Sequence, residues 1–108
     1  MKSSEKLCWV YMTAGSIEEA KSIGQILVGQ NLAACVNLFE NMTSIYNWED
    51  KLEGGHEVVM IAKTRKALMA ELIETVKSHH SYDIPCILEL PIQGGNPAFL
   101  SWIERETT

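Results

Sequence analysis

The sequence predicts an α+β fold, a β-α-β-β-α-β sandwich with an extra helix at the C-terminus. Runs of β-branched and aromatic residues, bounded by turn residues, alternate with stretches whose apolar residues recur every three or four positions. In addition, 108 residues suffice for one hydrophobic core but leave no room for a second. We therefore expect a single domain over residues 1–108.

The first strand and the first helix are expected within the first thirty or so residues. Leu7–Met12 is apolar almost throughout, which favours a strand. Ser16 and Glu19 have the spacing of a capping box, in which the serine oxygen accepts an amide of the first turn and the glutamate reaches back to the cap amide. Asn31 is expected to end this helix in a left-handed conformation. The buried stripe consists of Ala20, Ile23, Ile26 and Leu27.

A long hairpin is expected next. Leu32–Phe39 reads as the second strand, and Thr43–Trp48 continues it in extended form. Gly54 and Gly55 predict the turn, because paired glycines permit positive φ. The returning strand is Glu57–Lys63, whose nearly continuous apolar run is typical of a strand covered on both faces.

The second long helix is expected to begin at Thr64, whose hydroxyl can cap it. Its end is predicted near His79 and His80, where the apolar spacing stops. The residues expected on its buried stripe are Leu68, Leu72, Ile73 and Val76. This helix therefore connects the hairpin to the last strand.

The last core strand is predicted at Cys86–Leu90, after a turn at Tyr82–Pro85 and with Pro91 at its end. Asn96 and Pro97 then have the residue types of a helix cap and a first helical position. The terminal helix is expected to run through Phe99, Leu100, Trp102 and Ile103. Two split β-α-β units with right-handed crossovers combine into a ferredoxin-like sheet with both long helices on one face.

Such a sheet leaves the hairpin uncovered in a single chain. Ile45, Tyr46 and Trp48 would then form exposed apolar surface beside an unpaired strand edge. Large apolar patches usually mark interfaces, and open edges favour strand pairing. The sequence therefore predicts self-association through the hairpin.

Composition excludes several classes of partner. The net charge is −5 and no basic stripe is present, so nucleic acid is not expected as a partner. The longest apolar stretch is far shorter than a membrane-spanning helix and no secretory segment is seen, so no membrane partner and a cytoplasmic location are expected.

No nucleophile elbow, phosphate loop or paired-cysteine motif occurs, and a Cys35–His80 pair has no orienting third group, so no enzyme is expected.

Five segments of the sequence together resemble the motifs of one protein family: Leu32–Asn37, Ser44–Trp48, Glu57 with Lys63-Thr64, His80–Tyr82 with Pro85, and Gly95-Asn96 with Phe99–Ile103. In order and spacing, from about residue 7 to residue 104, they resemble the CutA divalent-ion tolerance proteins. The resemblance implies a compact homotrimer whose long hairpins pair between subunits. It also implies an association with copper and other divalent metal ions, and an architectural kinship to PII-type signal proteins, which bind small effectors at subunit clefts.

The resemblance also implies candidate metal ligands. The family's proposed copper ligands are a cysteine that closes the first strand and a histidine pair that ends the second helix. His79 and His80 match the pair, whereas Met12 occupies the cysteine position and offers a neutral thioether, which suits Cu(I) better than Cu(II). Cys35 matches a further family cysteine. Two readings without metal stay open, namely histidines that stabilise a helix C-terminus and a buried core thiol.

A second candidate site involves anion binding. Lys63, Thr64 and Arg65 lie at a strand-to-helix junction, where helix amides and cationic side chains can hold an anion. Tyr82 and Trp102 lie nearby in the family arrangement, which implies an effector pocket between subunits. Capping and ordinary ion pairing are the alternative roles. The function is thus expected to be copper or divalent-cation tolerance; a PII-like regulatory trimer and a trimer that presents loops to a partner protein are the alternatives.

Overall fold

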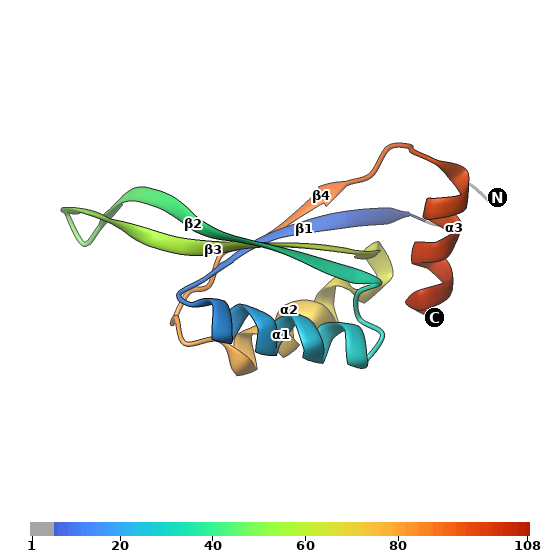
Figure 1. Cartoon of the computed structure of the whole chain (residues 1–108), viewed down its shortest axis with the longest axis horizontal. Coiled ribbons are helices and arrows are strands. Elements are labelled where there is room, and N and C mark those ends of the chain that lie inside the picture. Colours follow the sequence, from blue (N-terminus) through green and yellow to red (C-terminus); the bar gives the residue numbers. More distant parts are fainter. Residues whose placement is uncertain (1–5) are drawn as a thin grey trace.

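Strands and helices follow one another in the predicted order. The strands are β1 (Leu7–Ala14), β2 (Cys35–Trp48), β3 (Lys51–Arg65) and β4 (Ile87–Pro91), and the helices are α1 (Ile17–Gly29), α2 (Met69–His79) and α3 (Pro97–Glu106). The computed structural model describes residues 6–108 and forms one antiparallel sheet in the order β2-β3-β1-β4 (Figure 1). This split arrangement confirms the ferredoxin-like α+β fold. A single domain over residues 1–108 stays a prediction, and its residues 1–5 lie outside the described part.

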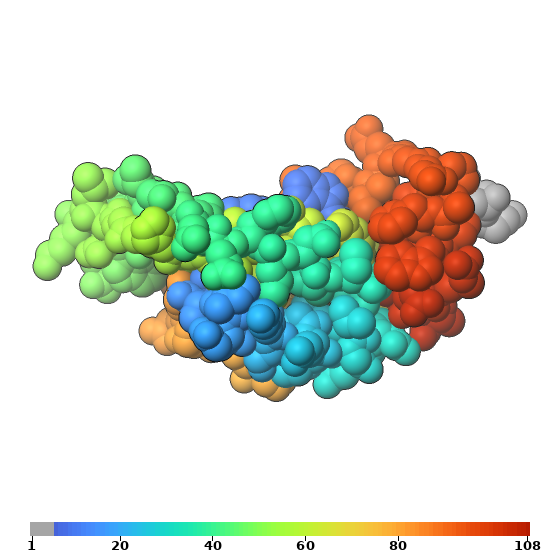
Figure 2. Space-filling view, in the orientation of Figure 1, coloured from blue at the N-terminus to red at the C-terminus, as the bar shows by residue number. Residues whose placement is uncertain are grey.

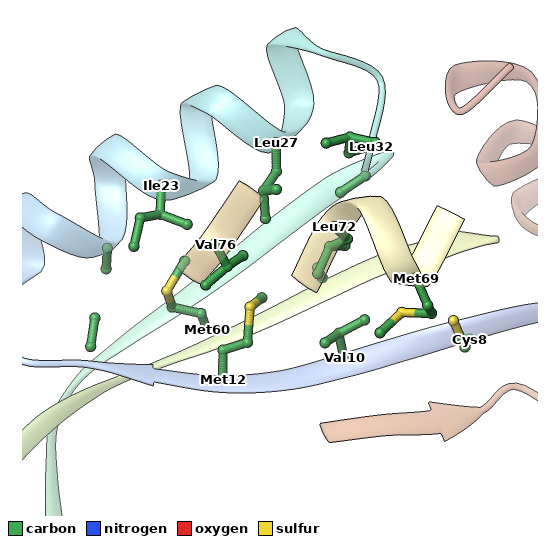
Figure 3. Packing of buried hydrophobic residues seen from close by; sticks show 14 of the residues in the cluster. Cys8, Val10, Met12, Ile23, Leu27, Leu32, Met60, Met69, Leu72 and Val76 are labelled. Carbon is green, nitrogen blue, oxygen red and sulfur yellow. The ribbon is translucent and has the colours of Figure 1, made fainter. Parts of the chain in front are cut away.

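The main core lies between the sheet and the two long helices. Alternate residues of β1 and β3 point toward α1 and α2, as the period of a strand requires (Figure 3). Val10, Met12, Met60 and Leu72 are each at most 1% exposed. Burial of each such side chain stabilises the fold by about 1.5–3 kcal/mol. The interleaved side chains of Figure 3 therefore account for the position of both helices on one face.

The local capping signals are confirmed in large part. The Ser16 hydroxyl oxygen accepts the amide of Glu19 at 3.1 Å, and Asn96 accepts the amide of Ala98 at 3.1 Å. Asn31 has the expected left-handed conformation, with φ of 60°. One detail differs, because the Glu19 carboxylate accepts the amide of Gly15 at 3.2 Å instead of returning to the cap amide. The second carboxylate oxygen of Glu19 accepts the amide of Ser81, after α2.

The hairpin turn does not lie at Gly54 and Gly55 as predicted. It lies at Glu49 and Asp50, between the paired residues Trp48 and Lys51, and both turn residues have positive φ, 51° and 65°. A two-residue turn of this kind is common between twisted strands but normally recruits Asn and Gly. Gly54 lies within β3 instead, where an added Cβ would meet the Ser44 carbonyl oxygen at 3.2 Å. The prediction failed because this glycine permits a close approach of strands, not a turn.

The two extended segments expected before the turn form one strand with a bulge. Phe39 pairs with Val59 and Met42 with Glu57, so β2 carries one residue more than β3 between these pairs. Asn41, inside the bulge, has φ of 63°. The strand also begins at Cys35 rather than at residue 32, because the amides of residues 32 and 33 still bond to the end of α1.

Thr64 does not cap the second helix. Thr64 is fully buried and lies at the end of the buried part of β3. Its hydroxyl donates to the Leu32 carbonyl oxygen at 2.7 Å. A short 3₁₀ turn over Lys66–Leu68 then leads into α2, which ends at His79 as predicted. The last strand begins at Ile87, one residue later than expected.

The hairpin extends well beyond the helices. In Figures 1 and 2 its tip forms one end of the molecule, and α3 lies near the opposite end. The molecule measures 48 × 25 × 23 Å, and its radius of gyration of 14.7 Å exceeds the value of about 13 Å expected for a compact chain of this length. No helix within residues 6–108 combines the length and the hydropathy that crossing a bilayer requires.

Candidate functional site

Met12 lies inside the main core. Its side chain is 1% exposed, and its backbone pairs with Met60 on β3 (Figure 3). A thioether in this position fills space between the sheet and α2, as flexible methionines commonly do. Its sulfur would reach a metal ion only after the surrounding core had opened.

His80 is buried at the end of α2. Its side chain is 1% exposed, its Nε2 lies 2.8 Å from the Thr13 carbonyl oxygen, and its Nδ1 accepts the amide of Tyr82 at 3.1 Å. Both ring nitrogens are therefore occupied, Nε2 by the Thr13 carbonyl oxygen and Nδ1 by the Tyr82 amide. His80 would have to give up one of the two hydrogen bonds to bind a metal ion.

His79 faces the solvent. Its Nδ1 lies 2.9 Å from the carbonyl oxygen of Thr75, one turn back on α2, and 3.0 Å from the hydroxyl of the preceding residue, Ser78. The other ring nitrogen, Nε2, has no hydrogen-bond partner within residues 6–108. Of the candidate pair, His79 is therefore the residue that offers an accessible imidazole nitrogen.

Cys35 lies apart from the histidines. It is half-buried and pairs with Lys63 on β3, whereas the His80 ring contacts Thr13, which pairs with Val59. Four residues along a strand separate these positions by about 13 Å. Among the described residues, no three or more His, Cys, Asp or Glu side chains are grouped as a metal site would require. One chain thus brings the candidate ligands together only in part.

Glu19, which the sequence predicted only as part of a helix cap, connects the start of α1 to the end of α2. Glu19 accepts the amide of Ser81 at 2.6 Å and its hydroxyl at 3.1 Å, and His80 Nδ1 lies 3.9 Å away. Burial by itself raises the pKa of Glu19, but the hydrogen bonds from Ser81 and Gly15 bring that pKa below its ordinary value. The ionised carboxylate therefore holds the His79–Tyr82 segment against the start of α1.

A second carboxylate connects this segment to the hairpin. Glu57 accepts the Tyr82 hydroxyl at 2.8 Å with one oxygen and the Ser44 hydroxyl at 2.5 Å with the other. The Tyr82 ring meets His80 edge-on, with 4.7 Å between ring centroids. Burial and the hydrogen bond to Glu57 raise the pKa of Tyr82 to about 12, so the hydroxyl stays protonated. These contacts join residues far apart in the sequence, so no local sequence pattern predicts them.

The expected effector residues are divided between two places. Lys63 donates to the Asn37 side-chain oxygen, whereas Tyr82 binds Glu57, six residues or about 20 Å away along β3. Thr64 is occupied by its internal bond to the carbonyl of residue 32. Within one chain Lys63 and Tyr82 therefore lie at separate sites.

Lys63 lines a groove on the face of the sheet that α1 and α2 leave open. We call it the α3 groove, because α3 and the loop before it form one wall. Its volume is about 570 Å³, and its lining includes Trp9, Phe39, Ile61, Lys63, Phe99 and Leu100. Trp102 contacts the Phe99 ring at 5.3 Å between centroids. Arg65 holds the other end of α3, through Thr107 and the Glu104 carbonyl oxygen.

Comparison with known proteins identifies relatives over nearly the whole chain. Residues 8–106 match the family model of the CutA1 divalent ion tolerance protein. The divalent-cation tolerance protein CutA of Archaeoglobus fulgidus is 46% identical over 97 residues, which cover 90% of this chain and 94% of the relative. Protein CutA 1, chloroplastic, of Oryza sativa is 40% identical over 98 residues. The chain spans about half the length of this plant relative, 55%, and of its Arabidopsis thaliana counterpart, 54%.

Solved structures of CutA proteins have the same fold as this chain. The periplasmic divalent cation tolerance protein CutA from Archaeoglobus fulgidus superposes with a TM-score of 0.92 at 43% identity, covering 94% of this chain and 99% of that one. CutA1 from Oryza sativa gives a TM-score of 0.93 at 38% identity, covering 95% and 94%. With its split sheet, its long hairpin and a family match over residues 8–106, this chain belongs to the CutA1 divalent ion tolerance family.

Proposed function

We propose that this protein acts in tolerance to divalent cations by binding copper, without catalysing a reaction. Its family membership and the accessible Nε2 of His79 support this proposal. Imidazole is a good ligand for copper, which also leads the affinity series of divalent metals. His79 is the anchor of the site, and His80 joins it when its bond to the Thr13 carbonyl oxygen or to the Tyr82 amide is released.

The test is a competition titration of the apo protein with Cu(II), and with Cu(I) under reductant, against a chelator. His79→Ala is expected to weaken binding at least about tenfold. His56→Ala is the matched control, because His56 is an exposed histidine on the hairpin. Equal affinities of the wild type and His79→Ala would remove this histidine from the site. Preference for Cu(I) would support a contribution from Met12, and a separate Cys35→Ala variant tests the thiol.

We propose further that the protein is a homotrimer assembled through its hairpins and through the open face of the sheet. Ile45 and Leu52 on the hairpin are 76% and 82% exposed in the single chain. Apolar surface of this extent favours association. Light scattering is expected to give three times the chain mass of 12.1 kDa, and Leu52→Lys is expected to lower it. A monomeric wild type would contradict this assembly.

An effector function is the second candidate, supported by Lys63 in the α3 groove. In this reading the trimer is a regulatory module that binds a small anion, as a PII-like protein would. A thermal-shift screen with organic acids and nucleotides tests it, because a ligand that binds only the folded state raises the melting temperature. Absence of any stabilisation would exclude this candidate.

The cytoplasm is the proposed location. Cys8, Cys35 and Cys86 are free thiols, a state that reducing compartments maintain. The names of the relatives refer to other compartments, chloroplastic for the Oryza sativa protein and periplasmic for the Archaeoglobus fulgidus structure. Cell fractionation with an antibody against the native protein tests the proposal, and recovery with periplasmic or organellar markers would contradict it.

A further inference from the structure

The hairpin loses the support of the helix-covered body at a defined residue. β1 pairs with β3 as far as Ala14 and Val58, so Glu57, the next residue, begins the part of the hairpin that has only two strands within residues 6–108. The bulge of β2 lies at the same level, because Met42 pairs with Glu57 on its far side. Two-stranded hairpins by themselves are only marginally stable in water. Order beyond Glu57 therefore depends on the contacts made at this point.

One side chain of the body reaches the hairpin at this level. The Tyr82 hydroxyl donates to one oxygen of Glu57 at 2.8 Å, and the other oxygen accepts the hydroxyl of Ser44 on the opposite strand. Ser44 pairs with Gly55, so Glu57 binds it diagonally and spans both strands. Within residues 6–108, the bond from Tyr82 to Glu57 is the one side-chain hydrogen bond that joins the hairpin beyond the bulge to the body. It therefore anchors both strands where pairing with β1 ends.

The same tyrosine is fixed by the end of α2. Its amide donates to His80 Nδ1 at 3.1 Å, and its ring meets the His80 ring edge-on, with 4.7 Å between centroids. The Tyr82 ring also lies over Gly15, where an added Cβ would stand 3.4 Å from the hydroxyl oxygen and 3.5 Å from a ring carbon. Glu19 holds the intervening Ser81 by its amide and its hydroxyl. The His80 ring and a short segment clamped to α1 thus set the position of the Tyr82 hydroxyl.

We propose that Tyr82 acts as a latch between the end of α2 and the hairpin. Displacement of the His80 ring moves the Tyr82 ring packed against it, releases the hydroxyl from Glu57 and loosens the hairpin beyond the bulge. This inference rests on the copper binding proposed above and names its regulation, because His80 takes up a metal ion only by giving up one of its two hydrogen bonds. Since the hairpin is also the proposed contact between subunits, copper binding and assembly oppose each other, and each weakens the other by the same factor.

The first test removes the tyrosine hydroxyl alone. Tyr82→Phe keeps the ring and should raise amide hydrogen exchange in residues 42–57 at least about fivefold, because the bond to the Glu57 carboxylate is lost. Exchange in the helix-covered part of the sheet should stay at the wild-type rate. Tyr11→Phe is the matched control, since the Tyr11 hydroxyl on β1 has no hydrogen-bond partner in the part of the chain that the structure describes. Unchanged hairpin exchange in Tyr82→Phe would overturn the latch.

The second test asks whether a change in the hairpin reaches His80. Glu57→Gln should shift the imidazole ¹⁵N signals of His80, because the two side chains are connected through Tyr82. In a Tyr82→Phe background the same substitution should leave these signals in place. A shift that persists in that background arises from charge acting through space and would refute the latch, as would the absence of a shift in both backgrounds. Glu57→Gln also takes the place of Tyr82→Phe in the exchange measurement if the latter does not fold.

Copper separates the latch from the function that it regulates. Saturation with the copper ion that binds more tightly should raise hairpin exchange in the wild type to the level of Tyr82→Phe and should change that variant little. If copper binds at His79 and hairpin exchange does not respond, copper binding stands and the latch fails as its regulator. If no copper binds, the proposed function fails, and the exchange rates and imidazole signals of the variants alone decide whether the latch exists.

Discussion

The helix-covered body and the hairpin share strands β2 and β3 but hold apolar residues in opposite environments. In the body, Met60 is fully buried between the sheet and the helices. In the hairpin, Ile45 and Leu52 are largely exposed although both are as apolar as core residues. The body therefore has its own core, whereas the single chain leaves these apolar side chains of the hairpin exposed. The apolar pattern of a strand thus predicts burial without telling which molecule provides it.

The strongest test of this comparison replaces one large side chain in each region. Leu72→Ala should lower the free energy of unfolding by about 2–5 kcal/mol, because it leaves a cavity under the sheet. Leu52→Ala should change it by less than about 0.5 kcal/mol when the chain is monomeric. Urea unfolding at several protein concentrations measures both. A large effect of Leu52→Ala at high concentration would show that the hairpin is buried by another copy.

A pH titration sharpens the comparison on the side of the body. Burial, and then the negative charge of Glu89, raise the pKa of the Cys8 thiol to about 11 from 9.0, against a smaller opposite effect of Lys66. A pKa raised on folding means that the neutral thiol stabilises the folded state below pH 9 and that this contribution disappears as the pH rises to about 11. The total loss is about 2–3 kcal/mol.

The measurement is the free energy of unfolding between pH 9 and pH 11, with thiolate absorbance as a direct probe. Cys8→Ala should be less stable at neutral pH but should show a flatter pH dependence over this window. Tyr82, at the base of the hairpin, adds a loss at still higher pH, because its pKa of about 12 also lies above the ordinary value. An unchanged slope in Cys8→Ala would assign the alkaline effect to other groups.

The fold could be predicted from local signals wherever the structure depends on neighbours in sequence. Ser16 and Asn96 cap their helices as their residue types indicate, because a cap needs only the next turn. The hairpin turn could not be predicted, since Glu49 adopts a positive φ that its side chain does not favour, and Asp50 does so without a neighbouring glycine to mark the turn. Gly54 misled the prediction because a close approach between strands and a turn both call for glycine.

The candidate site was predictable as a set of residues but not as an arrangement. The histidine pair is present at the end of α2, yet one ring faces the solvent and the other bonds to Thr13, 67 residues away. The link from Glu57 to Tyr82 spans 25 residues. Such contacts depend on the sheet register, which local spacing does not determine. For the same reason the separation of Lys63 from Tyr82 emerged only from the structure.

A buried hydroxyl provides a smaller test of the body. Thr64 donates to the Leu32 carbonyl oxygen at 2.7 Å and thereby fixes the chain that leaves α1 against β3. Thr64→Val keeps the shape and removes the donor, so the free energy of unfolding should fall by about 1–2 kcal/mol. Thr43→Val on the exposed part of β2 is the matched control and should have almost no effect. Equal effects would show that the hairpin is as tightly constrained as the body.

The smallest expected effect has the opposite sign and concerns the hairpin tip. Replacing Glu49 and Asp50 by Asn and Gly gives the residues that a turn with two positive φ angles favours. The free energy of unfolding should rise by about 1 kcal/mol, because side chains that resist this conformation are removed. Thermal unfolding in the Leu52→Lys background, which is expected to be monomeric, measures the gain without a contribution from assembly. If the free energy of unfolding does not rise in the monomeric variant, the tip is already frayed in the monomer. If it rises only in the oligomer, the tip becomes ordered through contacts with another copy.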